Sequence, residues 1–307
     1  VDPTLITVSD FIKTLLDDND AAAARATLGA LAASDLTAAS ESAAGIAEIA
    51  THAETDAGAD DARIVTPKKL YATPGIYRKN ALINGNFRIW QRGTSLSVPT
   101  DTGAYVSDRW FFQNYGGAVH TISQEIVANG VENENAVKCQ VTTADIDIQP
   151  ANHSAIKYGI EGWDFRRFVG KTATLSFWVK ATKTGTYCVA FCNTGSDRSY
   201  IAEYTINQSN TWEKKSITLT FNYSGGTWDY TTGLGVRVWF IIACGSTYQT
   251  TPGAWQTGNF IATANQVNGT DSVSNAFWLT QVQLELGSAA TPFEHRPYQQ
   301  ELALCQR

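Results

Sequence analysis

The chain has 307 residues, of which 17% are charged and 43% are hydrophobic, and its formal net charge is -6. This composition excludes a mainly disordered chain, and the acidic balance without clustered Lys and Arg argues against nucleic-acid binding. The longest strongly apolar run, 238–244, is far shorter than the ~20 residues of a membrane-spanning helix, so we expect no membrane insertion.

The five cysteines are expected to be reduced, buried thiols. Cys188 and Cys192 are four residues apart in a predicted strand, which separates their α-carbons by about 13 Å. A disulfide needs less than about 7 Å between α-carbons. No cysteine spacing resembles a zinc site, and the sequence assigns no metal-ligating residue and no cofactor.

Composition changes near residue 79. Residues 1–79 contain 19 Ala and no Trp, whereas all nine Trp lie after residue 80. We therefore divide the chain into an Ala-rich helical segment, 1–79, and a β-domain, 80–307.

The first segment predicts short α-helices. A helix-capping residue or a proline in the first helical position marks four starts: Ser9, Asp20, Ser34–Asp35 and Thr66–Pro67. The second helix, A-A-A-A-R-A-T-L, is expected to end at Gly29. The third is expected to run through A-A-G-I-A-E-I-A-T-H-A.

These helices carry too few large apolar side chains to build a core of their own. Their apolar stripes must therefore be buried elsewhere, and other copies of the same chain are the simplest partners. We expect association on this ground. The alternative is a flexible Ala-rich linker.

Residues 80–307 predict a β-sandwich. Strand-like segments, most of them alternating apolar and polar residues with a period of two, occur at 172–180, 186–191, 216–221, 234–242 and 275–286. Gly, Asn, Ser and Asp separate these segments. Such a pattern is typical of a sandwich or a jelly roll, and about 228 residues are enough for one large domain of this kind.

The second part is similar to the C-terminal jelly-roll domain of bacteriophage tail fibres, which in turn resembles carbohydrate-binding modules. The resemblance rests on N-A-L-I-N-G-N-F-R-I-W-Q-R-G-T at 80–94, S-D-R-W at 107–110, L-S-F-W-V-K-A at 175–181 and the ending from Q-L-E-L-G at 283–307. Segments 21–30 and 60–70 resemble recurring segments of fibre stalks.

This resemblance implies a mainly β fold in which a jelly-roll domain follows a trimeric stalk of short α-helices. It implies a homotrimeric tail-fibre protein of the virion, made in the host cytoplasm, that recognises a host surface polysaccharide or lipopolysaccharide. The N-terminal part is then expected to join other phage tail or baseplate proteins. A structural fibre or adaptor protein, whose jelly roll serves assembly, is the alternative.

The stretch N-G-N-F-R-I-W-Q-R-G at 84–93 is expected to be structural. Its apolar residues are strand-like, and its two arginines can pair with carboxylates such as Asp108 or Glu285. Because the first and last strands of a jelly roll often lie side by side, residues 283–286 are expected to pair with this stretch. A structural calcium ion held by Asn86 and Glu285 is a further possibility.

The sequence predicts a binding protein rather than an enzyme. The four His are scattered, and there is no G-x-S-x-G, P-loop or complete dinucleotide-binding motif. A glycosidase needs two carboxylates across a cleft, and the neighbouring acids Asp145, Asp147, Glu161 and Asp164 are expected to lie in solvated loops. We assign no catalytic residue, and a polysaccharide depolymerase is the third alternative.

Three aromatic loop segments, 161–167, 225–230 and 246–257, predict sugar contacts. Aromatic rings cover the C–H face of a sugar, while amide, carboxylate and guanidinium groups bind its hydroxyls. The candidate carbohydrate-binding residues are Trp163, Arg166, Trp228, Asp229, Tyr230, Tyr248, Gln249, Trp255 and Gln256. Packing of these aromatics at the ends of the sandwich or against a neighbouring subunit is the alternative.

Three strand tryptophans, Trp178, Trp239 and Trp278, lie opposite the main apolar face of their predicted strands. We expect burial against a neighbour in the trimer, with a sugar groove on the second face of a sheet as the alternative.

Overall fold

The computed structural model describes residues 20–29, 38–40, 45–57, 60, 62–67, 79–127, 135–222 and 224–306. The chain divides into two units, Val1–Thr73 and Pro74–Arg307, and each is described by itself. No helix in these described ranges is long and apolar enough to cross a bilayer.

In the first unit, the helix predicted from Asp20 is confirmed as α2 (Ala21–Leu28). Oδ1 of Asp20 accepts hydrogen bonds from the backbone N–H groups of Ala22 at 2.8 Å and Ala23 at 2.9 Å. This is the arrangement of an N-cap, which satisfies donors that have no partner within the helix. Gly29 follows with a φ of 64°, a conformation that glycine adopts without strain.

The helix predicted from Ser34 is wrong in its described part. The backbone there makes two parallel bridges, Ala38 with Ile46 and Ile49 with Ile64. A short helix, α3 (His52–Ala57), begins only after them. Thr51 and Glu54 cap each other: Thr51 N–H donates to Glu54 Oε2 at 2.8 Å, and Glu54 N–H donates to Thr51 Oγ1 at 3.3 Å. This capping box places the helix start after the Ala-rich run and not within it.

The other predictions for the first unit stay open. The helix predicted from Ser9 lies outside the described residues, and so does most of the helix predicted from Pro67. Association into a trimeric stalk stays a prediction.

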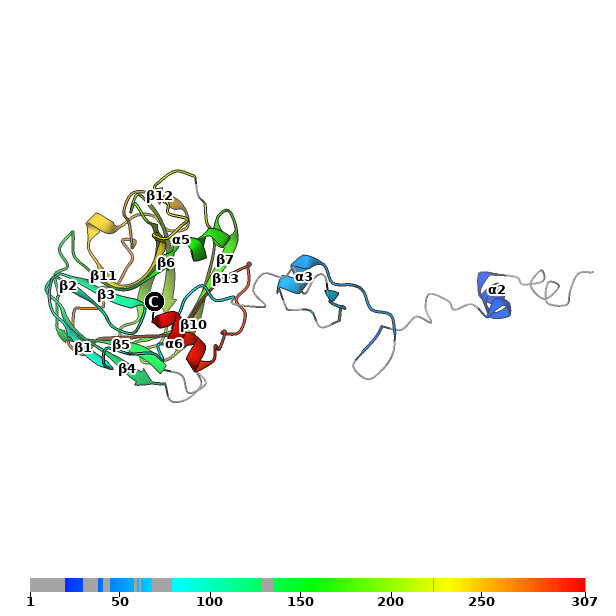
Figure 1. Cartoon of the computed structure of the whole chain (residues 1–307), viewed down its shortest axis with the longest axis horizontal. Helices are drawn as coiled ribbons and strands as arrows, with labels where there is room; N and C mark the ends of the chain where they lie inside the picture. The colour runs from blue at the N-terminus through cyan, green and yellow to red at the C-terminus, as the bar shows by residue number, and fades with distance from the viewer. Residues whose placement is uncertain are drawn as a thin grey trace, which may run out of the picture. The chain divides into compact units, whose positions relative to one another are not determined.

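The second unit is a mainly β sandwich of two antiparallel sheets (Figure 1). One sheet has six strands in the spatial order β1 (Ser95–Val98), β4 (Val119–Ile126), β5 (Asn135–Thr143), β13 (Ala276–Leu286), β7 (Thr172–Ala181) and β10 (Glu213–Thr220). The other has seven strands, in the order β12 (Trp255–Thr257), β9 (Arg198–Ile206), β8 (Gly185–Asn193), β11 (Leu234–Cys244), β6 (His153–Glu161), β3 (Trp110–Tyr115) and β2 (Thr102–Tyr105). The chain passes repeatedly from one sheet to the other.

The five predicted strands are confirmed as β7, β8, β10, β11 and β13. In β7, the apolar residues Leu175, Phe177 and Val179 are all fully buried, because alternate residues of a strand point to the same face. The ring of Phe177 meets that of Phe240 in β11 edge to face, with centroids 5.0 Å apart. The core thus lies between the sheets.

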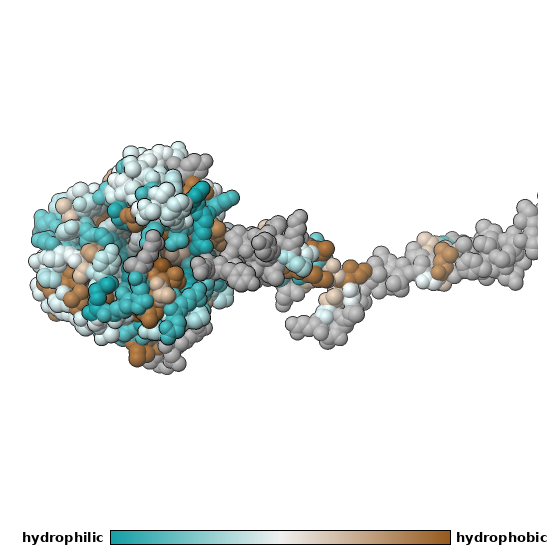
Figure 2. Space-filling model, in the orientation of Figure 1, coloured by the Kyte–Doolittle hydropathy of each residue, from teal (hydrophilic) through white to brown (hydrophobic). Residues whose placement is uncertain are grey.

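The described residues of the second unit also form four short helices: α5 (Gly162–Phe165), η3 (Arg166–Phe168), η4 (Ser246–Tyr248) and α6 (Tyr298–Cys305). The last of these, red in Figure 1, ends the described chain. Figure 2 shows that the coloured surface of the sandwich in this view is mainly hydrophilic or neutral, with small separate hydrophobic patches.

The stretch 84–93 is not a strand, contrary to the strand-like pattern of its apolar residues. Residues 83–86 form turns, and Asn84 and Phe87 have φ angles of 56° and 51°, which strands exclude. The end of the chain does lie beside this region, but the pairing differs from the predicted one, because residues 80–85 bond to residues 282–284. Ala81 N–H donates to the Leu284 carbonyl at 2.9 Å, and Val282 N–H donates to the Gly85 carbonyl at 2.8 Å.

A buried hydrogen-bond network holds these turns in place. The side chain of Asn84 donates to the carbonyls of Ile89 at 2.9 Å and Asp108 at 3.0 Å, and accepts from Ile89 N–H at 2.9 Å. The backbone N–H of Asn84 donates to the carboxylate of Glu301 in α6. Glu301 in turn pairs with Arg296 at 3.3 Å. The last helix therefore fixes the first loop of the domain.

The two carboxylates that were predicted as partners of the arginines in this stretch, Asp108 and Glu285, also lie in this region. Arg92 Nη2 lies 3.6 Å from Asp108 Oδ1, as expected. The carboxylate of Glu285 accepts hydrogen bonds from Thr291 N–H at 2.9 Å and from Gln283 Nε2 at 2.8 Å, so protein donors engage the group that was considered for calcium. Within the described residues, no group of three or more His, Cys, Asp or Glu is placed to hold a metal ion.

All five cysteines are free and buried, as predicted. Burial raises the pKa of the Cys192 thiol to about 12, which keeps it protonated and unreactive at neutral pH.

The strand tryptophans do lie opposite the core-facing residues. Trp239 and Trp278 are nevertheless only 8% and 6% exposed within a single chain. Lysine side chains cover them: Lys157 Nζ lies 4.7 Å from the Trp239 ring centroid, and Lys180 Nζ lies 4.1 Å from that of Trp278. These two rings therefore need no neighbouring subunit for their burial. Trp178 is half-buried.

We expect Asn84→Ala to lower the free energy of unfolding by about 3 kcal/mol, because three buried backbone groups lose their partner. Asn210 is the matched control, since it has the same φ of 56° but is exposed. Asn210→Ala is expected to cost only about 1 kcal/mol for the left-handed backbone. Chemical denaturation measures both values, and equal losses would contradict the role given to the buried network.

Candidate functional site

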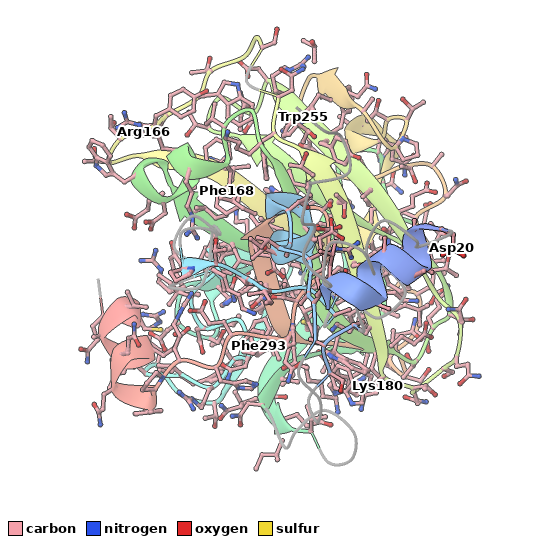
Figure 3. The ribbon with its side chains drawn as sticks, turned by 90° about the vertical axis from the view of Figure 1, so that its right-hand side faces the viewer. Asp20, Arg166, Phe168, Lys180, Trp255 and Phe293 are labelled. Atoms are coloured by element: carbon pink, nitrogen blue, oxygen red, sulfur yellow. The ribbon has the colours of Figure 1, made fainter. Side chains whose placement is uncertain are left out.

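Residues from the three predicted loop segments meet at one end of the sandwich. Figures 1 and 3 place α5, η3 and β12 at that end. The ring of Trp228 stacks on that of Phe165 in α5, with centroids 5.4 Å apart and planes 11° apart. It also meets Trp255 of β12 at 5.6 Å, nearly edge to face. Tyr230 lies parallel to Phe165 at 6.3 Å. We call these four residues the end cluster.

Gly162 sets the position of α5. Its N–H donates to the Gly233 carbonyl at 2.8 Å, and the N–H of Trp163 donates to the Thr231 carbonyl at 2.8 Å. A Cβ atom at position 162 would lie 2.4 Å from the Thr231 nitrogen, so only glycine allows this approach. As a result Phe165 points into the core, while Trp163 is 53% exposed.

Arg166 accompanies Trp163 on the surface. Its guanidinium carbon lies 5.8 Å from the Trp163 ring centroid, within the range of a cation–π contact. This pair is therefore available to a ligand, at the same end of the domain as the end cluster.

The carboxylate of Asp229 stabilises its own loop. Its Oδ1 accepts hydrogen bonds from Thr231 N–H at 2.6 Å and from Thr231 Oγ1 at 2.9 Å. The backbone hydrogen bond from Thr231 holds the pKa of the Asp229 carboxyl below its usual range. The indole N–H of Trp228 is likewise used within the loop, because it donates to the Gly225 carbonyl at 2.8 Å.

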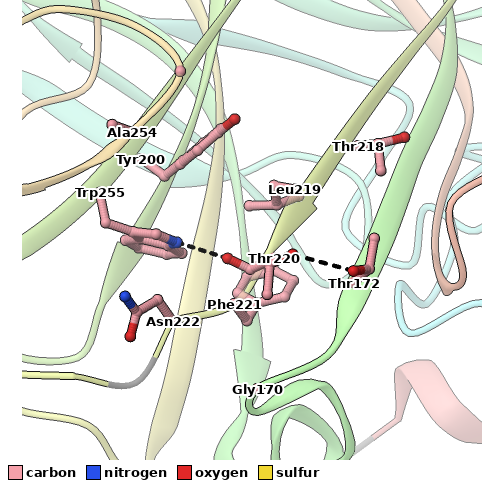
Figure 4. Close-up of a pocket in the computed structure, with 11 residues that line it drawn as sticks. Gly170, Thr172, Tyr200, Thr218, Leu219, Thr220, Phe221, Asn222, Ala254 and Trp255 are labelled. Atoms are coloured by element: carbon pink, nitrogen blue, oxygen red, sulfur yellow. Dashed lines mark hydrogen bonds between the residues drawn. The ribbon is translucent and has the colours of Figure 1, made fainter.

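A pocket of about 530 Å³ lies beside Trp255 (Figure 4). Trp255 pairs with Tyr200 of the neighbouring strand β9, and its indole N–H donates to the Thr220 carbonyl of β10 at 2.8 Å. Since β12 and β10 are edge strands of different sheets, this bond closes the end of the sandwich. The pocket is lined by Gly170, Thr172, Tyr200, Thr218, Leu219, Thr220, Phe221, Asn222, Gly253, Ala254 and Trp255.

The lining offers rings beside neutral hydrogen-bonding groups. The rings of Trp255 and Tyr200 are half-buried and lie 5.6 Å apart. Opposite them, the hydroxyls of Thr172 and Thr220 lie 3.1 Å apart, and Asn222 is exposed at the rim. The pocket lining contains no carboxylate, imidazole, thiol or cation. Such a surface can bind a neutral polar molecule with an apolar face, but it holds no acid–base pair.

Of the nine predicted residues, only Trp255 lines this pocket. Tyr248, Gln249 and Gln256 lie outside both the pocket lining and the end cluster. Tyr248 packs edge-on against His153 at 5.2 Å, over the outer face of the seven-stranded sheet. The amide of Gln249 donates to the Cys244 carbonyl at 2.9 Å. The amide of Gln256 donates to Thr251 Oγ1 at 3.2 Å. The contacts of all three side chains lie within their own loop or sheet.

The sequence did not predict six pocket residues with ring, hydroxyl or amide groups: Thr172, Tyr200, Thr218, Thr220, Phe221 and Asn222. One signal was present, because hydroxyl residues alternate with core residues along 216–221. In an edge strand such as β10, that polar face stays accessible.

No family model matches the chain, and no curated protein matches it either. Several solved structures are similar to it. "CBM4 structure and function" has 16% identity, covers 66% of this chain and 98% of that one, and has a TM-score of 0.35. A putative sugar binding protein from Bacteroides thetaiotaomicron VPI-5482 has 13% identity, covers 68% and 100%, and has a TM-score of 0.39.

The enzymatically active domain of bacteriophage CBA120 tailspike protein 4 is also similar, with 12% identity and a TM-score of 0.36. The match covers 73% of this chain, which spans only 22% of the tailspike chain. At these identities and TM-scores, what such proteins bind or cut says nothing about this chain.

We expect Trp228→Ala to destabilise the domain by about 2 kcal/mol, because its half-buried ring packs on Phe165 and Trp255. Trp163→Ala is expected to cost less than about 0.5 kcal/mol, because that ring is mostly in solvent. Thermal or chemical unfolding of both variants checks this. A larger loss of unfolding free energy for Trp163→Ala than for Trp228→Ala would contradict the assignment of Trp228 to packing and of Trp163 to the exposed surface.

Proposed function

We propose that the chain is a homotrimeric phage tail-fibre protein that binds a host cell-surface glycan in the pocket beside Trp255. One observation carries the proposal: rings, hydroxyls and an amide line one open pocket without any charged group. A sugar ring has the complementary surface, with a C–H face that packs on an indole and hydroxyls that pair with neutral polar groups.

The same lining favours binding over cleavage. Glycoside hydrolysis uses two carboxylates that flank the scissile bond, and the lining of this pocket contains none. We therefore propose a binding protein and not a depolymerase.

Exposed apolar residues in the first unit support the proposed trimer. Leu28, Ile46, Ile49 and Ile64 are each more than half exposed in the single chain. Packing of three copies would remove these side chains from water, and each fully buried one would stabilise the assembly by about 2 kcal/mol. Three copies also place three weak sugar sites on one fibre, which raises the overall affinity without new contacts. In this proposal the N-terminal part joins other tail or baseplate proteins of the virion.

We expect the full chain to sediment at three times the mass of one chain. Replacement of Ile46, Ile49 and Ile64 with Ser is expected to dissociate the trimer, because it removes exposed apolar groups of the first unit. Analytical ultracentrifugation of both proteins measures this. A folded monomer of the unmodified chain at micromolar concentration would contradict the proposed trimer.

We expect Trp255→Ala to weaken binding of the recognised surface polysaccharide at least tenfold, about 1.4 kcal/mol, because the pocket loses its largest ring. Asn222→Ala tests the same site without a large change in packing, and a several-fold loss is expected. Trp212→Ala is the matched control, since Trp212 is also half-buried but packs beside Trp178 and Lys180, outside this pocket.

Affinity electrophoresis against a panel of bacterial surface polysaccharides, together with host-cell adsorption, measures these effects. Lost binding with intact trimers supports receptor recognition. Dissociated trimers in Trp255→Ala would instead support the alternative, a structural or adaptor protein whose sandwich serves assembly.

A further inference from the structure

A second hollow, of about 700 Å³, lies on the outer face of the seven-stranded sheet. Residues of β2, β3, β6 and β11 line it, and these strands are neighbours in the sheet (Figure 1). We call it the sheet groove. The end of α6 reaches its margin, where Cys305 contributes to the lining.

One side of the sheet groove is a row of cross-strand partners. Tyr105 of β2 pairs with Phe111 of β3, and Phe111 pairs with Lys157 of β6. Register partners on adjacent strands share a face, so these three side chains stand next to one another. The rings of Tyr105 and Phe111 meet edge to face at 5.2 Å, and Tyr105 is 57% exposed. The row therefore consists of two aromatic rings followed by the ammonium group of Lys157.

Gly159 lies beside this row. It lies two residues beyond Lys157 in β6, so it faces the same side of the sheet, and its partner across the strands is Arg237 of β11. The side chain of Leu234 lies beside Gly159, since a Cβ atom at position 159 would be 2.7 Å from Leu234 Cδ1. Lys157 and Arg237 both line the sheet groove.

The charge of the sheet groove is opposite to that of the whole chain. Four cations line it, Arg92, Arg109, Lys157 and Arg237, with one carboxylate, Glu161, so four minus one gives a formal charge of +3. The chain as a whole carries -6. The positive charge is therefore concentrated here against the general acidic balance.

Two of these cations already have acidic partners. Arg109 Nη2 lies 3.2 Å from Glu161 Oε1, and Arg92 Nη2 lies 3.6 Å from Asp108 Oδ1. These pairs leave little of their charge for a ligand.

Lys157 and Arg237 have no carboxylate within 4.0 Å in the part of the chain that the structure describes. Lys157 Nζ lies 4.6 Å from the Phe111 ring centroid and 4.7 Å from that of Trp239, and it donates to Gln113 Oε1. Arg237 donates to the Asn193 carbonyl at 3.3 Å and to Ser196 Oγ at 3.1 Å. The groups that these two cations contact directly are therefore neutral.

This arrangement is costly without an anion. Burial, together with the charge of Arg237, lowers the pKa of the Lys157 ammonium to about 8. The positive charges of Lys157 and Arg237 are partly desolvated and repel each other. An anion between them would offset this repulsion and would favour the protonated form of Lys157.

We propose that the sheet groove binds an acidic sugar residue, whose carboxylate or phosphate lies between Lys157 and Arg237 and whose ring packs on Tyr105 and Phe111. The rings distinguish this ligand from a free anion, because inorganic phosphate has no apolar face to cover them. The inference rests on the proposed function only in taking the ligand to be a glycan. The pocket beside Trp255 has a neutral lining and is a separate site.

The test uses the full chain with polygalacturonate and phosphomannan as probes, each compared with its carboxyl-reduced or dephosphorylated form. We expect at least one acidic polymer to bind at least tenfold more tightly than its neutral form. Lys157→Gln and Arg237→Gln are each expected to remove this preference, while Lys157→Arg, which keeps the charge, retains most of it. Circular dichroism confirms that each variant is folded.

Lys180→Gln is the matched control. Lys180 also stands over a tryptophan, with Nζ 4.1 Å from the Trp278 ring centroid, but on the outer face of the other sheet. We expect this variant to keep the preference for the acidic polymer. An equal loss in Lys180→Gln, or no preference for either acidic polymer in the unmodified chain, would overturn the proposal.

Inorganic phosphate is the competitor that separates a sugar site from an anion site. We expect phosphate to displace the acidic polymer only at concentrations at least tenfold above those of polymer repeat units. Displacement at equal concentration would show that the site binds an anion and not a sugar.

The two proposals fail separately. Binding of a neutral polymer that depends on Trp255, without acidic preference, refutes only the sheet groove. Acidic preference unaffected by Trp255→Ala, with no neutral binding, refutes only the pocket.

Discussion

The closure of the sandwich by its own two ends is the constraint on which the second unit depends. The first loop cannot form a strand, because Asn84 and Phe87 take left-handed backbone angles. It is held instead by buried hydrogen bonds, among them one from Asn84 N–H to Glu301 in the last helix. A buried polar group without a hydrogen-bond partner destabilises the fold by about as much free energy as several favourable contacts contribute. Both ends of the domain must therefore be present together.

This closure also positions the surfaces that carry function in our account. Asp108 accepts a hydrogen bond from Gln91 N–H at 2.7 Å, which ties the loop before β3 to the first loop. Arg109, at the margin of the sheet groove, follows directly. At another place the indole N–H of Trp255 joins β12 to β10 and forms the wall of the neutral pocket. Packing and recognition thus use the same side chains.

Much of the sandwich was predictable from the sequence, because a period of two reports which face of a strand is buried. In β7 this period puts Leu175, Phe177 and Val179 on one face, and all three are buried. The turns at 83–86 were not predictable, since their partners are distant: Asn84 and Glu301 are 217 residues apart. The helix expected from the cap at Ser34–Asp35 failed because the capping box that forms, between Thr51 and Glu54, lies further along the chain.

The candidate site was predictable only in part, for a similar reason. Aromatic residues in polar loops indicated Trp228 and Trp255, and the structure brings them together. The pocket itself arises where edges of both sheets meet, and no local pattern reports that Tyr200 and Thr172 face one space. The sheet groove shows the same limit for charge. A net charge of -6 conceals a local excess of cations, because register and not composition decides which side chains are neighbours.

The central claim is that a glycan binds beside Trp255, and a crystal structure of the full chain with a bound oligosaccharide from a recognised polysaccharide tests it most directly. The account predicts electron density for a sugar ring packed on the Trp255 indole, with hydroxyls at hydrogen-bonding distance from Thr218, Thr220 or Asn222. An oligosaccharide bound with no contact to Trp255 or Asn222, and with this pocket filled only by water, would contradict it.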